Sequence, residues 1–167
     1  MVSRIVTCGS PGIRRKSEKV KNITGEIQRI FDDMIDTMYA GNGIGLSAIQ
    51  IGIPLRMIVV NVSGRKEDLI CLVNPEILAF SGKSVIKEGC LSIPGFFAEV
   101  KRPAKIVVKG MSRKGDETIM KAAGLSARAI QHEIDHLSGK LFIDYLSIFK
   151  KIAVYPKLYR IKHSISK

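Results

Sequence analysis

The residues with the clearest chemical potential are His132, Glu133 and His136, which form the pattern His-Glu-x-x-His. On a helix, His136 lies about 40° and Glu133 about 100° from His132, so the three side chains share one face. Two imidazoles four residues apart can bind one metal ion, and a glutamate that is not a ligand can take a proton from water on that ion. The alternative is two ordinary helix histidines beside a surface glutamate, because five-residue matches also occur by chance.

A catalytic ion of this kind needs a third protein ligand and one open position. Downstream, Phe142 stands where the metzincin pattern would have its third histidine, and no glutamate follows the motif. Asp144 and His163 are the remaining downstream donors, and neither is well placed. Upstream, Cys90 follows Gly89 at the end of a predicted strand, where glycine permits close backbone approach. Cys90 is therefore a candidate ligand, and the alternative is a small buried hydrophobic residue.

Periodicity predicts the elements that position these residues. Apolar residues recur at three- and four-residue steps over 20–38, which predicts an amphipathic helix ended by the glycines at 41 and 43. A second helix follows Ser126, a good N-cap residue, and runs over 127–137 to Gly139. Antiparallel strands are predicted at 55–62, 68–80, 83–92, 100–112 and 117–122. We therefore predict an α+β fold whose strands pack around the His-Glu-x-x-His helix.

Composition fits one compact domain. The chain has 167 residues, of which 46% are hydrophobic and 25% charged. At this length about 70% of the unfolded surface can be buried, so a core forms without disulfides or a structural metal. No apolar stretch approaches the ~20 residues of a membrane helix, and the first residues lack the apolar segment of a signal peptide. Three widely spaced cysteines predict no disulfide framework. We expect a cytoplasmic protein without membrane contact.

The charge is unevenly distributed. Lysine and arginine number 27 against 15 acidic residues, a net charge of +12. After Asp144 there are six basic and no acidic residues. We predict a catalytic domain at 1–148 and a basic tail at 149–167, in which Pro156 ends a short helix that a loose end follows. The tail could contact ribosomal RNA transiently, and the alternative is a solvated basic segment.

Three segments taken together resemble the signature motifs of bacterial peptide deformylases, in that family's order. They are GIGLSAIQ at 43–50, EGCLSIP at 88–94 and QHEIDHLSG at 131–139. By itself the first segment could equally be a plain connection between a helix and a strand. Outside the motifs the resemblance extends through Ile5-Val6, Pro11 and Arg14, the stretch 100–103 and the stretch 141–144, and so covers most of the chain up to about residue 148.

The resemblance implies a single divalent metal ion held by Cys90, His132 and His136, with water in the fourth position. It implies that this water or hydroxide attacks the N-formyl group on the N-terminal methionine of newly synthesised proteins and that formate is released. Glu133 would be the general acid and base. Gln50 and the backbone N–H of Leu91 would stabilise the developing oxyanion. A thiolate ligand suits iron(II), zinc, nickel or cobalt, and the resemblance points to iron(II) in the cell.

The resemblance also implies a substrate site. Two glycines would offer backbone groups to the peptide, and four apolar residues would line a pocket for the methionine side chain. These residues are Gly45 and Gly89 for the backbone contacts, and Ile44, Ile86, Leu125 and Ala129 for the pocket.

The sequence departs from the family in three places. Ser47 stands where alanine is usual, and we expect little effect. Phe97 stands where bacterial members often have arginine, so Phe96 and Phe97 could form an apolar rim beside the peptide site instead of polar contacts. Pro156 interrupts the long C-terminal helix that some members carry.

Two other functions fit the sequence less well. A zincin peptidase is disfavoured by Phe142 and by the lack of a downstream glutamate. A basic ribosome-binding or RNA-binding protein with a structural metal is disfavoured because a closed site needs four ligands and the sequence supplies three candidates. The sequence thus favours a monomeric enzyme that acts on N-formylmethionyl nascent peptides.

Overall fold

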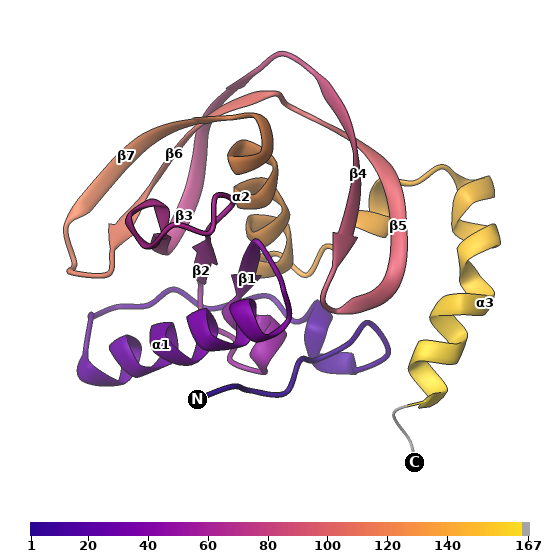
Figure 1. Cartoon of the computed structure of the whole chain (residues 1–167), viewed down its shortest axis with the longest axis horizontal. Coiled ribbons are helices and arrows are strands. Elements are labelled where there is room, and N and C mark those ends of the chain that lie inside the picture. The colour runs from indigo at the N-terminus through magenta and orange to yellow at the C-terminus, as the bar shows by residue number, and fades with distance from the viewer. Residues whose placement is uncertain (165–167) are drawn as a thin grey trace.

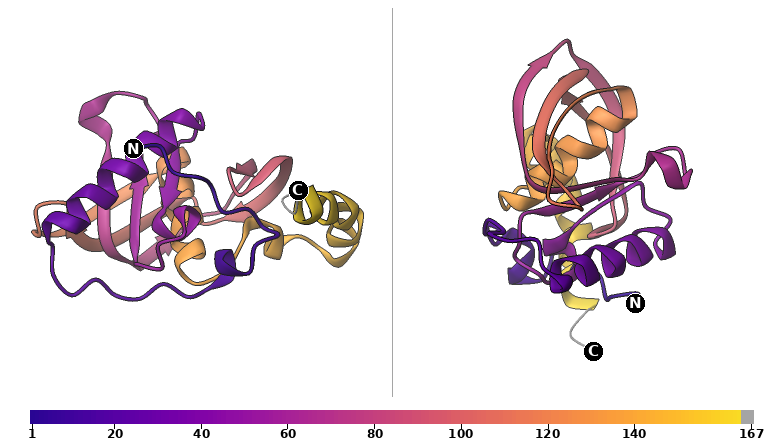
Figure 2. Two further views of the ribbon diagram at one scale, coloured as in Figure 1. Left: turned by 90° about the horizontal axis from the view of Figure 1, so that it is seen from below. Right: turned by 90° about the vertical axis from the view of Figure 1, so that its left-hand side faces the viewer.

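A computed structural model describes residues 1–164 (Figure 1). The strands form two antiparallel sheets; α1 and α2 lie on opposite sides of the larger one, and α3 lies beside β5 of the smaller one (Figures 1 and 2). The α-helices are α1 (Gly25–Ala40), α2 (Gly124–Leu137) and α3 (Ile148–Ser164), and the strands are β1 (Gly45–Ser47), β2 (Met57–Val60), β3 (Ile70–Ser81), β4 (Ser84–Cys90), β5 (Ile93–Arg102), β6 (Lys105–Ser112) and β7 (Glu117–Ala123). This arrangement confirms the predicted α+β class.

The five-stranded sheet has the order β1-β2-β3-β6-β7, and β4 and β5 form a separate hairpin. The chain leaves the large sheet at the turn after β3, where Gly82 has a φ of 66°, and returns to it between β5 and β6. Helix α2 therefore lies between the large sheet and the hairpin (Figure 1). All pairings between these strands are antiparallel, as predicted.

Strand β2 shows why the large sheet is covered on both faces. All four of its residues are buried, and successive side chains point to opposite faces. Met57 and Val59 pack into the core cluster beneath α1, whereas Ile58 and Val60 pack into the cluster beneath α2. A continuous apolar run is the pattern expected of a strand buried on both faces.

Helix α1 begins later than its apolar pattern predicts. The Thr24 hydroxyl accepts a hydrogen bond from the backbone N–H of Ile27 at 3.4 Å and caps the helix, so the expected start at residue 20 is wrong. Val20 is nevertheless buried in the cluster beneath α1. The apolar pattern therefore starts before the helix does. Such a pattern shows which residues are buried, but it does not show which of them are helical.

Helix α2 begins at Gly124, two residues before the predicted N-cap Ser126. The residue before the helix is Ala123, and no side chain caps the first turn. Helix α2 ends at Leu137, as predicted, and Gly139 follows with a φ of 76°. The error at the start reflects the direct passage from β7 into the helix, which leaves no loop for a capping residue.

Strands β1, β5 and β6 differ from the prediction. The run predicted at 100–112 is two strands, because Pro103 separates the end of β5 from the start of β6. Strand β5 begins at Ile93, and its first seven residues were not predicted as a strand. Strand β1, at 45–47, was also missed because three residues carry no measurable alternation.

Helix α3 corrects the prediction for the tail. The sequence predicts that Pro156 ends a short helix, but α3 continues through it to Ser164. Proline removes one helical hydrogen bond, and here buried Val154 and partly buried Leu158 pack against the same core cluster on either side of it. The loose end predicted after Pro156 is therefore wrong for 157–164, which belong to α3, and its last residues, 165–167, lie outside the described part of the chain. The domain boundary after residue 148 remains a prediction. No helix within 1–164 combines the length and apolar character needed to cross a membrane.

The backbone conformation at Gly139 predicts that a side chain there lowers the stability of the fold. Its positive φ disfavours any other residue, and a Cβ there would overlap the backbone oxygen of Arg14. We expect Gly139→Ala to lower the free energy of unfolding by at least about 1–2 kcal/mol, and the melting temperature by about 2–4 °C for each kcal/mol. Gly12→Ala is the control, because nothing lies within 4 Å of its Cβ position. Equal melting temperatures for the two variants would contradict this account.

Candidate metal centre

Helix α2 and the end of strand β4 bring the predicted metal ligands together. His132 and His136 lie on α2, and Cys90 is the last residue of β4. One ligand atom from each residue lies within 4.8 Å of the other two. The Cys90 Sγ and the His136 Nε2 are 3.3 Å apart. Three donors that are distant in sequence therefore converge on one point.

These three residues fit a metal ion. In a tetrahedral site with bonds of 2.0–2.3 Å, ligand atoms lie about 3.3–3.8 Å apart, so small movements of the observed cluster satisfy it. A thiolate and two imidazoles are typical ligands of soft and borderline divalent metals. The cluster supplies three ligands and leaves a fourth position for another molecule, which is the arrangement of a catalytic site.

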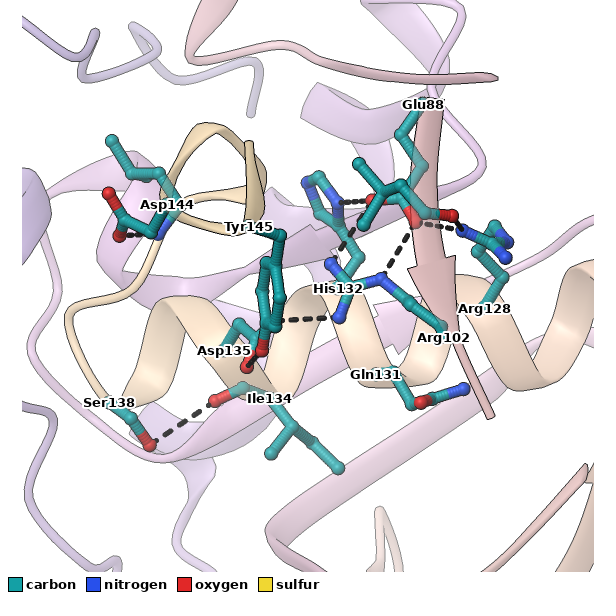
Figure 3. Close-up of polar contacts among 12 residues, drawn as sticks. Glu88, Arg102, Arg128, Gln131, His132, Ile134, Asp135, Ser138, Asp144 and Tyr145 are labelled. Carbon is teal, nitrogen blue, oxygen red and sulfur yellow. Dashed lines mark hydrogen bonds and ion pairs between the residues drawn. The ribbon is translucent and has the colours of Figure 1, made fainter. Parts of the chain in front are cut away.

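A buried carboxylate, Glu88, holds the first histidine in place (Figure 3). Its Oε2 lies 3.0 Å from the His132 Nδ1, so Nε2 is the ring nitrogen that remains to bind an ion. Its Oε1 accepts a hydrogen bond at 2.7 Å from the Arg102 guanidinium and another from the Arg128 guanidinium. All four side chains are at most 9% exposed. Strands β4 and β5 and helix α2 are thus joined at a single carboxylate.

The network continues to Asp135, on the next turn of α2 from His132 (Figure 3). Arg102 Nη1 donates to the Asp135 carboxylate at 2.6 Å, and the Tyr145 hydroxyl donates to it at 3.0 Å. Arg128 also donates to the backbone oxygens of Val100 and Ser84, at 2.9 and 2.8 Å. The two carboxylates compensate the charges of the two guanidinium groups, which would be costly to bury alone.

Burial and these contacts shift the pKa values of the site. Burial would raise the pKa of Glu88, but hydrogen bonds from His132 and Arg102 lower it to about 2. Burial would lower the pKa of His132, but hydrogen bonds to Cys90 and Glu88 raise it to about 10. Burial and the nearby positive charge of His132 hold the pKa of His136 well below its ordinary value. His136 therefore presents a neutral nitrogen to an ion, whereas at His132 an ion competes with a proton.

Glu133 lies beside the cluster without a strong protein partner. Its side chain is 4% exposed, and its Oε2 has no hydrogen-bond partner within residues 1–164. A Cβ at position 45 would approach the Glu133 Oε1 to 2.7 Å, so Gly45 leaves room for this carboxylate. Burial raises the pKa of Glu133 to about 7, against the opposing effect of His132. A carboxylate with this pKa can accept and return a proton near neutral pH.

Gln50 directs its amide nitrogen toward the same point. Its Nε2 lies 3.6 Å from the Cys90 Sγ and donates to the Ser92 hydroxyl at 3.2 Å. Its Oε1 accepts hydrogen bonds from the Ser47 N–H and hydroxyl, both at 2.8 Å. The amide orientation is therefore set by Ser47, and the NH₂ group faces Cys90, one of the predicted metal ligands. Leu91 lies next to Cys90, and its side chain packs on the glycines at 41 and 43.

A cleft of about 470 Å³ opens onto Cys90, His132 and Glu133. All the residues predicted to bind the substrate line this cleft except Ile86. Ile86 lies on β4 next to Lys87, which does line the cleft, and is 38% exposed. The predicted residues in the lining are Ile44, Gly45, Gln50, Gly89, Leu91, Leu125 and Ala129.

Some residues of the site have only a weak signal in the sequence, and others have none. Glu88 lies in the second motif, and its even spacing from Cys90 on a strand predicts that both point to one face. Arg102 and Arg128 could not be assigned from the sequence, because a basic residue is usually solvated and their partner is distant in the chain. Asn42, Pro94 and Gly95 also line the cleft and were not predicted.

The Glu88 network predicts a specific stability change. We expect Glu88→Gln to lower the free energy of unfolding by about 3–5 kcal/mol at pH 7, because it leaves buried guanidinium charge uncompensated. The pKa of Glu88 is depressed in the folded state, so its contribution is full above pH 4.5 and falls toward pH 2. Urea titrations with a chelator present should show the difference from wild type shrinking over that interval. Glu76→Gln, in an exposed pair with Lys109, is the control and should cost less than about 1 kcal/mol.

Comparisons with known proteins show the family to which the chain belongs. The polypeptide deformylase family model matches residues 2–151. The peptide deformylase of Bartonella tribocorum is 49% identical over 158 residues, 92% of this chain and 89% of that protein. A crystal structure of a peptide deformylase from Legionella pneumophila has a TM-score of 0.93 at 38% identity and covers 100% of this chain and 99% of that one. That from Thermus thermophilus has a TM-score of 0.91 at 36% identity, with 98% and 99% covered. The chain therefore belongs to the peptide deformylase family.

Proposed function

We propose that this chain hydrolyses the N-formyl group from the N-terminal methionine of newly synthesised proteins and releases formate. The observation that carries the proposal is the convergence of Cys90, His132 and His136 beside a buried carboxylate, Glu133, whose Oε2 has no partner among the described residues. The cleft that opens onto this group supplies room for a peptide end. Metal-dependent deformylation is the reaction of the family.

We propose that one divalent metal ion binds to Cys90, His132 and His136. When bound, such an ion lowers the pKa of water and polarises a carbonyl oxygen. The thiolate is a soft ligand, which suits iron(II), zinc, nickel and cobalt, and iron(II) is our proposal for the cell. Glu88 orients the first histidine through Nδ1, as carboxylates commonly do for histidine ligands.

Glu133 is the general acid and base in this proposal. Its carboxylate accepts a proton from the attacking water and later returns it to the amine nitrogen as the C–N bond of the formamide breaks. A pKa of about 7 suits both steps, because the group is then readily protonated and deprotonated. Formate and a free N-terminal amine are the products.

Gln50 and the Leu91 backbone N–H stabilise the developing oxyanion. The Gln50 NH₂ group is preorganised, since the N–H and hydroxyl of Ser47 both bind the amide oxygen and so fix the plane of the amide. Preorganised donors beside a reacting carbonyl are among the largest contributions to catalysis.

The substrate site has an apolar part and a backbone part. Ile44 and Leu125 are 40% and 45% exposed and line the cleft with Ala129. We propose that they receive the methionine side chain, with Ile86 at the edge. Gly45 on β1 and Gly89 on β4 would offer backbone groups to the peptide main chain. We also propose that the enzyme is a monomer in the cytoplasm, where its substrates arise and where its three free cysteines remain reduced.

The function is tested by two measurements on one anaerobic preparation, metal per chain and formate release from a formyl-methionyl peptide. We expect about one equivalent of metal and turnover for wild type. Glu133→Gln should retain the metal and lose at least about 100-fold in kcat/KM, because the proton acceptor is gone. A variant that hydrolyses the peptide at close to the wild-type rate would exclude Glu133 as the base. Metal without turnover in wild type would contradict the proposed reaction.

We propose that the basic tail contacts the ribosome transiently through α3. Lys150, Lys151 and Arg160 are exposed on this helix, and exposed Phe149 and Ile152 lie among them. A cationic surface binds RNA in a salt-dependent way. The competing interpretation remains a solvated helix.

Charge substitutions test this contact better than a deletion, since a deletion would also remove buried Val154 from the core. We expect the triple substitution of Lys150, Lys151 and Arg160 to glutamine to weaken co-sedimentation with ribosomes and to flatten its dependence on salt. The control is the triple substitution of Lys83, Lys105 and Lys121 to glutamine. It removes the same number of positive charges from exposed residues outside α3. Sedimentation equal to that of the control would exclude the tail contact.

A further inference from the structure

An exposed aromatic ring borders the cleft on the hairpin side. Phe97 on β5 is 58% exposed and lines the cleft. It is the register partner of Gly89 on β4. A Cβ on Gly89 would approach the Phe97 Cε1 to 2.5 Å, so the ring occupies the space that a side chain at this position would take. Phe97 thus covers the backbone of the strand that leads to Cys90.

Lys87 holds this ring in place. It lies two residues before Gly89 on β4, so both project to the same face of the hairpin. Its Nζ lies 5.7 Å from the centre of the Phe97 ring, a cation–π contact. Lys87 also lines the cleft. The ring therefore has a cationic neighbour that favours this orientation, although it is exposed.

The cleft lies between two strand edges. Strand β1 is an edge of the five-stranded sheet, and β4 pairs with β5 alone among the described strands. Gly45 of β1 and Gly89 of β4 both line the cleft. An extended peptide can add to such edges through main-chain hydrogen bonds, and its side chains then alternate between the two faces.

The two faces of the cleft differ in what they offer. On one side the cleft is lined by α2, whose residues Leu125 and Ala129 form part of the pocket proposed for the methionine side chain. The other face of β4 carries Lys87 and the Phe97 ring. A peptide whose first side chain points toward α2 directs its second side chain to the opposite face. The second residue of the substrate then meets Phe97.

We propose that Phe97, held by Lys87, is a specificity-determining residue that favours substrates with an aromatic or large apolar second residue. This inference rests on the proposed function and adds a preference within it. Aromatic contact of this kind is worth about threefold to tenfold in affinity. The effect should lie mainly in KM, because the second side chain is remote from the reacting carbonyl.

The test compares kcat and KM for two pairs of formyl peptides by formate release. The first pair is formyl-Met-Phe-Ala and formyl-Met-Ser-Ala, and the second pair moves the variable residue to the third position. We expect wild type to prefer phenylalanine about threefold to tenfold in the first pair only. Phe97→Ser should reduce that preference to less than about twofold, and Phe97→Leu should retain part of it.

Phe80→Ser is the matched control. Phe80 is 71% exposed on β3 and does not line the cleft, so its substitution should leave the preference intact. Equal kcat/KM for both peptides of the first pair in wild type would overturn the proposal, as would an unchanged preference in Phe97→Ser. A preference confined to the third position would also overturn it. Failure of wild type to deformylate any of the four peptides would instead contradict the proposed function.

Discussion

The buried carboxylate of Glu88 is the interaction on which the rest of the site depends. It lies between β4, β5 and α2 and contacts one residue that binds the metal in our proposal, His132, and two guanidinium groups. An isolated carboxylate would lose several kcal/mol on leaving water. Here the charge is compensated and most acceptor positions are used, so the carboxylate is held in one place. The hydrogen bond between this carboxylate and His132 then fixes the imidazole as well.

This arrangement explains how a two-stranded hairpin can hold Cys90, a metal ligand in our proposal, in a fixed position. A hairpin of two strands is marginal without packing against another element. Arg128 on α2 donates to Ser84 and Val100, and so fastens both strands to the helix. Cys90 at the end of β4 is then fixed relative to the two histidines of α2. The charge network supplies the rigidity that a small hairpin lacks.

The sequence predicted the parts of the molecule that local spacing determines. The helical period predicted that His132, Glu133 and His136 share a face, and strand-like runs between turn residues predicted most strands. It could not predict the pairing of Glu88 with Arg102 and Arg128, because that pairing depends on how distant segments meet. The error at Pro156 has the same origin. Local rules end the helix there, whereas packing on both sides of the proline continues it.

Gly45 and Gly89 show that the sequence leaves the neighbours of a site residue unpredicted. In the sequence they indicate close approach of the backbone to something, which is naturally taken to be the substrate. In the structure the nearest atoms belong to the chain's own side chains: the Glu133 carboxylate over Gly45 and the Phe97 ring over Gly89. Each missing Cβ therefore has two consequences, since it exposes a strand edge to a peptide and admits a functional side chain beside that edge. A larger residue at either position would displace the Glu133 carboxylate or the Phe97 ring, to which we assign catalysis and recognition.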